Sequence, residues 1–182
     1  LSLSGTNLYT GGTTVNGGVL KTLSLSALGS GSVALDAGVL DLDAALNIGS
    51  LSGQSGALLM MDFALGVKQT VDGTFGGTIS GAGKLAKSGS AALTLSGLNT
   101  YTGGTILSDG TLKTLSATAL GSGPVAVNAG LLDLDASLGI GSLSGTGGQI
   151  QLDGNTLTVT QSGTGNFYGQ FTDASASATS TL

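Results

Sequence analysis

Two Asp-Leu-Asp segments hold the paired carboxylates of this 182-residue chain: Asp41 with Asp43, and Asp133 with Asp135. On a strand, residues two apart share one face at about 6.5–7 Å, a spacing within the range of inverting glycosidases. We instead expect a solvated outer face, because no Arg, Lys or His lies near either pair to orient a substrate. Calcium normally takes six to eight oxygen ligands, so two carboxylates fall short. We therefore predict no catalytic residue, no cofactor and no metal site.

Composition excludes most other chemistry. The chain has no His, Cys, Trp, Arg or Glu, and ten Asp against five Lys give a net charge of −5. Disulfides, thiol chemistry, imidazole metal ligands and a Ser-His-Asp triad are therefore absent. An acidic chain without Arg is a poor nucleic-acid binder. The longest apolar run, 57–61, is far shorter than the ~18 residues of a spanning helix, and no signal peptide opens this sequence.

Two tyrosines lie at matching places in loops rich in Gly and Thr. Tyr9 and Tyr101 are either exposed adhesive aromatics or caps that fold back over a corner, and we favour the cap, with its ring buried and its hydroxyl in water. Phe75 and Phe167 also match, with apolar partners at Ile79 and Phe171, so we expect them in the core.

The remaining candidate functional residues are the lysines and one apolar segment. We expect solvated charges at Lys21, Lys84, Lys87 and Lys113, which would also discourage lateral strand pairing. Strict alternation around Leu58 and Met60 places Leu59 and Met61 on the outer surface, with Phe63 extending the patch. The alternative is a local bulge that turns one of the two inward. An exposed apolar patch of this kind often marks a contact.

Short strands separated by glycine-rich turns must position these residues. In Val39-Leu40-Asp41-Leu42-Asp43 and in 150–153, apolar and polar residues alternate with the period of a half-buried strand. No stretch shows a sustained helical period. Turns recur near positions 17, 37, 54, 82 and 109, a mean step of about 23 residues.

One internal repeat organises the whole chain. Shifted by 92 residues, positions 1–80 lie over 93–172 without a gap, and 44 of the 80 are identical. Together with the smaller steps, this predicts an all-β protein, a right-handed parallel β-helix of about eight coils in two blocks that superpose by translation along the axis. A β-sandwich is the rival fold, but it does not explain turns at coil-sized intervals.

Residues 79–97, which include Gly83-Lys84-Leu85, resemble the autotransporter-associated β-strand repeat, also called the passenger-associated transport repeat. The continuation at 99–105 and the segment 119–123 are similar to its later part. Residues 1–43 repeat the pattern without the opening Gly-Lys-Leu. The 92-residue internal repeat predicts domains at 1–92 and 93–172, the two β-helix repeat blocks. After Phe171 the family pattern stops, so we expect a Ser/Ala/Thr-rich tail or a divergent coil at 173–182.

The resemblance also implies a function. Such repeats belong to passengers of Gram-negative type V secretion, so we expect a structural, non-enzymatic stalk that supports outer-membrane translocation, folding and display of an adhesin-like protein at the cell surface after periplasmic transit. Its partner would be its own outer-membrane β-barrel translocator, outside this chain. Contacts to host cells, matrix or other copies stay open, and we expect no membrane-embedded segment. The alternative is a carbohydrate-active β-helix, a lyase, glycosidase or phage tailspike fragment.

Overall fold

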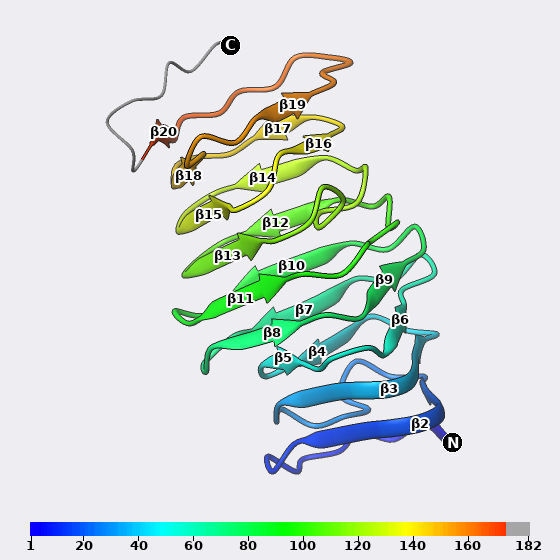
Figure 1. Ribbon diagram of the computed structural model, residues 1–182. Coiled ribbons are helices and arrows are strands. Elements are labelled where there is room, and N and C mark those ends of the chain that lie inside the picture. The colour runs from blue at the N-terminus through cyan, green and yellow to red at the C-terminus, as the bar shows by residue number, and fades with distance from the viewer. Residues whose placement is uncertain (174–182) are drawn as a thin grey trace.

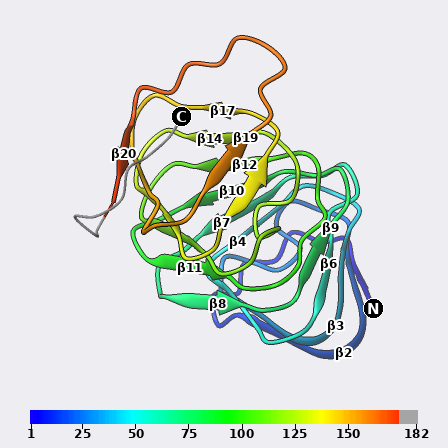
Figure 2. The same ribbon diagram turned by 45° about the horizontal axis from the view of Figure 1, so that its top comes forward.

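The computed structural model describes residues 1–173, and over these residues the chain is a parallel β-solenoid of about nine coils without a helix (Figure 1). Viewed obliquely toward one end, successive coils follow nearly the same outline (Figure 2). Strand pairs are parallel and join residues one coil apart, as in Leu85 with Thr105 and Leu112 with Leu132. The parallel solenoid expected from the sequence is therefore confirmed, and the β-sandwich is excluded.

Each coil has three faces, visited in the same order in every turn. Face 1 comprises the first halves of two long strands, then seven short ones: β2 (Thr13–Thr22), β3 (Val33–Leu42), β5 (Leu51–Ser52), β8 (Gly73–Phe75), β11 (Ala92–Leu95), β13 (Thr111–Thr114), β15 (Leu131–Leu134), β18 (Gln149–Gln151) and β20 (Gln170–Thr172). The long strands bend at their centres, where the pairing of β2 with β3 shifts register, so their second halves lie on the next face.

Face 2 continues from those second halves and carries β1 (Ser2–Leu3), β6 (Ala57–Leu59), β9 (Thr78–Ser80), β16 (Leu138–Ile140) and β19 (Leu157–Val159). Two loop segments bridge β9 to β16 through backbone hydrogen bonds such as Thr100 N to Ile79 O. Face 3 is one continuous ladder of β4 (Leu46–Ile48), β7 (Leu65–Lys68), β10 (Leu85–Ser88), β12 (Thr105–Leu107), β14 (Val125–Val127) and β17 (Leu143–Ser144).

The two 92-residue blocks are related by rotation as well as translation. β3 begins on face 1, whereas its equivalent 92 residues later, β14, lies on face 3; likewise β4 lies on face 3 and its equivalent β16 on face 2. A block thus spans four and two-thirds coils, about 19.7 residues each. The expectation that the blocks superpose by translation alone is wrong, because each strand moves one face around the axis.

The expected coil of about 23 residues is too long for the same reason. The turns near 17, 37 and 54 all join face 1 to face 2, and their spacings match one coil. The turns near 82 and 109 each lie at the next corner around the axis, so those two steps contain one and one-third coils. The sequence prediction treated every turn as the same corner and therefore gave about eight coils, whereas the structure has about nine.

A thin aliphatic core runs through the stack. Inward residues of adjacent coils lie over one another, as Leu65 does over Leu85 and Leu112 over Leu132, and these side chains are buried. Phe75 is fully buried, as expected, whereas Phe167 is half-buried at the edge of the core. Because each coil buries its apolar side chains mainly against its neighbours, stability is built up coil by coil.

Corner glycines set how closely coils approach. A Cβ on Gly97 would overlap the carbonyl oxygen of Gly77 in the preceding coil, at far less than van der Waals distance. No real side chain tolerates that distance, so the backbone itself would have to move. Gly17 lies in an equally glycine-rich turn, but a Cβ there meets nothing within 4 Å.

We therefore expect Gly97→Ala to lower the free energy of unfolding by about 3 kcal/mol through overpacking, and Gly17→Ala to change it by less than about 0.5 kcal/mol. Urea unfolding followed by circular dichroism measures both. Equal effects of the two substitutions would contradict this account of the corners.

Candidate functional site

Each Asp-Leu-Asp pair is bound by a lysine from the preceding coil. Lys21 Nζ lies 2.7 Å from Asp43 Oδ2 and 3.5 Å from Asp41 Oδ2. The same contacts recur in the second block, where Lys113 Nζ lies 2.7 Å from Asp135 Oδ2 and 3.1 Å from Asp133 Oδ2. We call these the first and second lysine–aspartate clusters.

The clusters correct the sequence prediction in one respect. We expected carboxylates without a basic neighbour and lysines that are merely solvated, whereas Lys21 and Lys113 each bind both carboxylates of one pair. The signal was in the sequence: Lys21 pairs in register with Asp41, and Lys113 with Asp133, 20 residues later in both cases. That spacing is one coil, and a coil length of about 23 residues concealed it.

Hydrogen bonding to the carboxylates favours the charged ammonium. The pKa of Lys21 is raised, mainly by its hydrogen bond to Asp43, and the pKa of Lys113 is raised mainly by its hydrogen bond to Asp135. A lysine whose pKa is raised by folding stabilises the native state below its ordinary pKa and loses that contribution as pH rises through the folded value. Both side chains are about one-third exposed, so solvent weakens the ion pairs.

The second cluster contains a third acid. One oxygen from each of Asp133, Asp135 and Asp153 lies within 4.8 Å of the others, and Gln151 Nε2 donates to Asp153 Oδ2 at 2.7 Å. The ammonium group of Lys113, which binds Asp133 and Asp135, already places a positive charge beside these carboxylates. In the first block Met61 stands where the second has Asp153, and both residues have positive φ, 44° and 47°.

Lys87 is the largest departure from expectation. We predicted a solvated charge, but Lys87, which belongs to β10, is completely buried. Its Nζ donates to the carbonyl oxygens of Gly89, Ala91 and Asp109 at 2.6–2.8 Å, which uses all three of its protons. Burial lowers its pKa, partly opposed by the charges of Asp109 and Asp72. Lys84 is exposed, as expected.

Other buried polar side chains fill corners in the same manner. Gln69 accepts from Leu51 N at 3.0 Å and donates to Val71 O at 2.9 Å. Asn99 accepts from Ile79 N at 2.8 Å and donates to Ala119 O at 2.7 Å. These side chains satisfy backbone groups that the turns leave without strand partners, so they serve the fold and are not arranged around a substrate.

The matched tyrosines have different surroundings. Tyr101 is fully buried and its hydroxyl is 2.6 Å from Thr105 Oγ1, which confirms a cap but not a hydroxyl in water. Burial raises the pKa of Tyr101. Tyr9 makes the same 2.6 Å contact with Thr13 Oγ1 in the first coil, but 40% of the residue is exposed.

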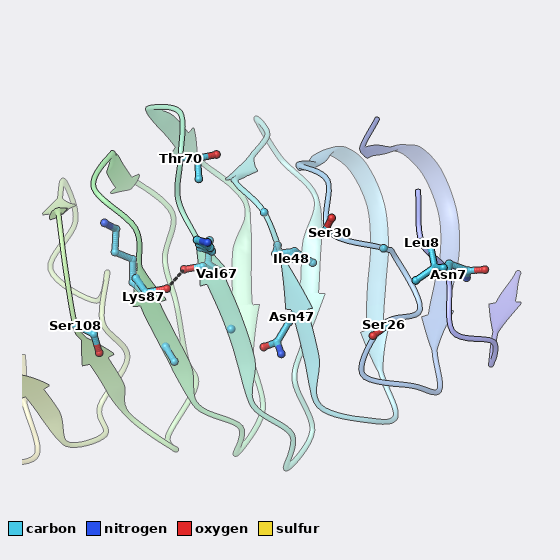
Figure 3. Close-up of a pocket in the computed structure, with 16 residues that line it drawn as sticks. Asn7, Leu8, Ser26, Ser30, Asn47, Ile48, Val67, Thr70, Lys87 and Ser108 are labelled. Carbon is cyan, nitrogen blue, oxygen red and sulfur yellow. Dashed lines mark hydrogen bonds between the residues drawn. The ribbon is translucent and has the colours of Figure 1, made fainter. Parts of the chain in front are cut away.

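A shallow groove of about 780 Å³ follows the outer side of face 3 (Figure 3). Its walls come from successive coils and carry small polar side chains, among them Asn47, Ser88 and Ser108, with the charge of Lys68 beside them. No aromatic residue lines it, so it offers no flat ring on which a sugar could stack.

The expected apolar patch is present, but of Leu59 and Met61 only Leu59 owes its outward direction to strand alternation. Met61 is 53% exposed and Phe63 36%, while Leu59 is half-buried. The strand β6 ends at Leu59, and Met61 lies in a turn with positive φ. The outward direction of Met61 therefore follows from the turn.

Among residues 1–173, no helix is long and apolar enough to span a membrane.

Comparison with known proteins places this geometry in context. Residues 1–21 and 85–113 match the Passenger-associated-transport-repeat family. The Adhesin BmaC autotransporter of Brucella suis biovar 1 (strain 1330) is 36% identical over 204 residues, which cover 94% of this chain. The chain spans only 6% of that adhesin's length. No solved structure matches the chain.

The contacts of Lys87 predict a measurable cost of its removal. Lys87→Met leaves three buried carbonyl oxygens without a donor, and we expect the free energy of unfolding to fall by about 2 kcal/mol. The exposed Lys84→Met is the control, with a change below about 0.5 kcal/mol. The pKa of Lys87 in the folded protein is lowered from its ordinary value of 10.5. Between the folded pKa and 10.5 the unfolded chain binds more protons than the native one, so the free energy of unfolding of the wild type rises with pH.

The difference between wild type and Lys87→Met should therefore widen as pH is raised across that window, measured by urea unfolding at a series of pH values. A difference that is constant or narrows would contradict the buried position of the ammonium.

Proposed function

From the premise that this chain is part of an autotransporter passenger with passenger-associated transport repeats, we propose that it is a structural stalk segment. In this role it supports translocation of the passenger across the outer membrane, its folding outside, and display of an adhesin-like protein at the surface of a Gram-negative cell. The translocator domain of the same protein is its proposed partner, and host-cell or matrix contacts belong to the whole protein.

The observation that carries this proposal is the continuous core. Buried aliphatic side chains follow one another from Val15 in β2 to Ile150 in β18, and each coil covers the core of the coil before it. Such a stack transmits rigidity along its length and needs no contact between distant parts of the sequence. Both properties suit a stalk.

The same architecture supports a role in translocation. A chain that emerges unfolded can add one coil of about 20 residues at a time, because each new coil finds its hydrogen-bond partners and its apolar cover on the last folded one. Once docked, a coil resists moving back, since its side chains would return to water. The absence of Cys is compatible with threading, because no disulfide can close a loop beforehand.

Non-enzymatic function is part of the proposal. The aspartates at glycosidase-like spacing are each bound to a lysine, and the arrangement occurs in both blocks. Repetition at equivalent positions suits a structural role better than a single active site.

The aspartates can be tested together by replacing Asp41, Asp43, Asp133 and Asp135 with Asn. We expect the fold to persist with a small decrease in stability, because partly exposed ion pairs contribute little, and the pKa values of Lys21 and Lys113 to fall. Circular dichroism, urea unfolding and NMR titration measure these. A polysaccharide-cleaving activity in the wild type that this variant lacks would establish the carbohydrate-active alternative.

The stalk proposal predicts that coil stacking and surface display fail together. In the full-length protein expressed with its translocator, Leu132→Asp buries a charge in the core of β15, so we expect several-fold less passenger exposed to protease on intact cells. Thr118→Asp, an equally acidic change at an exposed turn, is the control. Total passenger is measured in lysed cells. Normal display of the Leu132→Asp variant, despite an unfolded segment, would contradict the proposal.

A further inference from the structure

The outer side of face 3 differs in charge from the rest of this acidic molecule. Of the five lysines, Lys21 and Lys113 are bound to aspartates and Lys87 is buried. The other two, Lys68 at the end of β7 and Lys84 directly before β10, are exposed and form no ion pair with any residue of 1–173. No strand of face 3 contains an Asp. This face therefore carries the unpaired lysine charges of the chain.

We propose that the groove on face 3 binds a linear polysaccharide that carries carboxylate groups. The part of the groove that concerns us extends from Asn47 in β4 to Ser108 directly after β12 (Figure 3). The coils that form it have described coils on both sides, namely residues 25–31 before β4 and β14 after β12. This binding site goes beyond the proposed stalk function, because it concerns a ligand on the side of the stack.

Small side chains in register form the floor of the groove. Asn47, Gly66 and Ala86 are consecutive partners on β4, β7 and β10, between residues that are buried. A Cβ on Gly66 would overlap Asn47 Oδ1, so the Asn47 amide lies over the glycine. The next partner in this row, Ile106, does not line the groove. The floor is therefore flat enough for an extended chain to lie along it, with one amide group available to that chain.

One edge of the groove is a row of polar groups. Lys68 and Ser88 are register partners, and Ser108 occupies the same place on the next coil, where its N donates to Lys87 O. Successive members of this row are about 4.8 Å apart along the axis. The Ser108 hydroxyl makes no hydrogen bond within residues 1–173. An ammonium group followed by hydroxyl groups suits the carboxylate and hydroxyl groups along a chain of uronic acids.

The strand ladder excludes an extended peptide bound by strand pairing. The backbones of β7, β10 and β12 are paired with coils on both sides, so this face has no free edge that a peptide strand could join. A ligand must therefore be held by side chains. No aromatic ring lines the groove, so recognition depends on hydrogen bonds and charge, without the base stacking that single-stranded nucleic acids use.

The charge requirement is tested with a galacturonic acid oligosaccharide and with the same oligosaccharide after methyl esterification, which removes the charges and keeps the ring hydroxyl groups. Isothermal titration calorimetry of the intact chain should show binding of the acid form that weakens as salt is raised. The ester should bind about tenfold more weakly, because the charge-assisted hydrogen bond is lost. Equal binding of the two forms, or binding of neither, overturns the proposal.

Substitutions locate the ligand on the molecule. Lys68→Gln should weaken binding of the acid form about tenfold, because its ammonium no longer binds a carboxylate. Ser108→Asp should also weaken binding, because it places a negative charge at the edge of the groove. Lys113→Gln in β13 and Thr118→Asp at an exposed turn make the same charge changes away from face 3, and should change the affinity by less than about twofold. Circular dichroism verifies that each variant is folded.

Equal weakening by Lys68→Gln and Lys113→Gln would show that overall charge attracts the ligand, and it would overturn the assignment to the groove. A poly-aspartate peptide that binds as tightly as the acid oligosaccharide would overturn the choice of a polysaccharide. None of these results bears on surface display of the Leu132→Asp variant, so the stalk proposal stands or falls separately.

Discussion

Parallel backbone stacking is the constraint on which the rest of this molecule depends. Each coil must return after about 20 residues to a point one strand spacing, about 4.8 Å, along the axis. At that distance the tightest corners have room for hydrogen alone, as the Cβ positions at Gly97 and Gly77 demonstrate. The abundance of glycine, the narrow aliphatic core and the few bulky residues all follow from this one spacing.

What the sequence predicted well are features with a short period. Alternation in 39–43 and 150–153 identified strands, and the glycine-rich turns identified corners. The coil length was harder, because the turns near 54 and 82 look alike in sequence but lie at different corners. A fixed residue count between turns therefore does not measure a turn of the solenoid, whereas the register of Lys21 with Asp41 does.

The side chains that were misjudged bind groups beyond a turn or on the next coil: Lys21 binds aspartates one coil later, and Lys87 binds carbonyl oxygens both in the turn after its own strand and one coil later. Strand alternation alone places Lys87 on the same side as the buried Leu85 and Lys84 on the opposite side, but it does not reveal the three carbonyl oxygens that make burial of the ammonium possible. Turns leave backbone oxygens inside the corners, and a long side chain with an ammonium group can satisfy several at once. Polar residues in this core therefore complete the hydrogen bonding of the corners, and the apolar ones supply the cover.

The rotation of one third of a turn between blocks has a consequence for the exterior. A feature repeated every 92 residues, such as a lysine–aspartate cluster, moves to the next face at each recurrence: Asp41 lies on face 2 and Asp133 on face 1. Equivalent features are therefore displaced around the solenoid axis as well as along it. The two clusters of this chain therefore face directions that differ by about one third of a turn, and a flat surface cannot contact both at once.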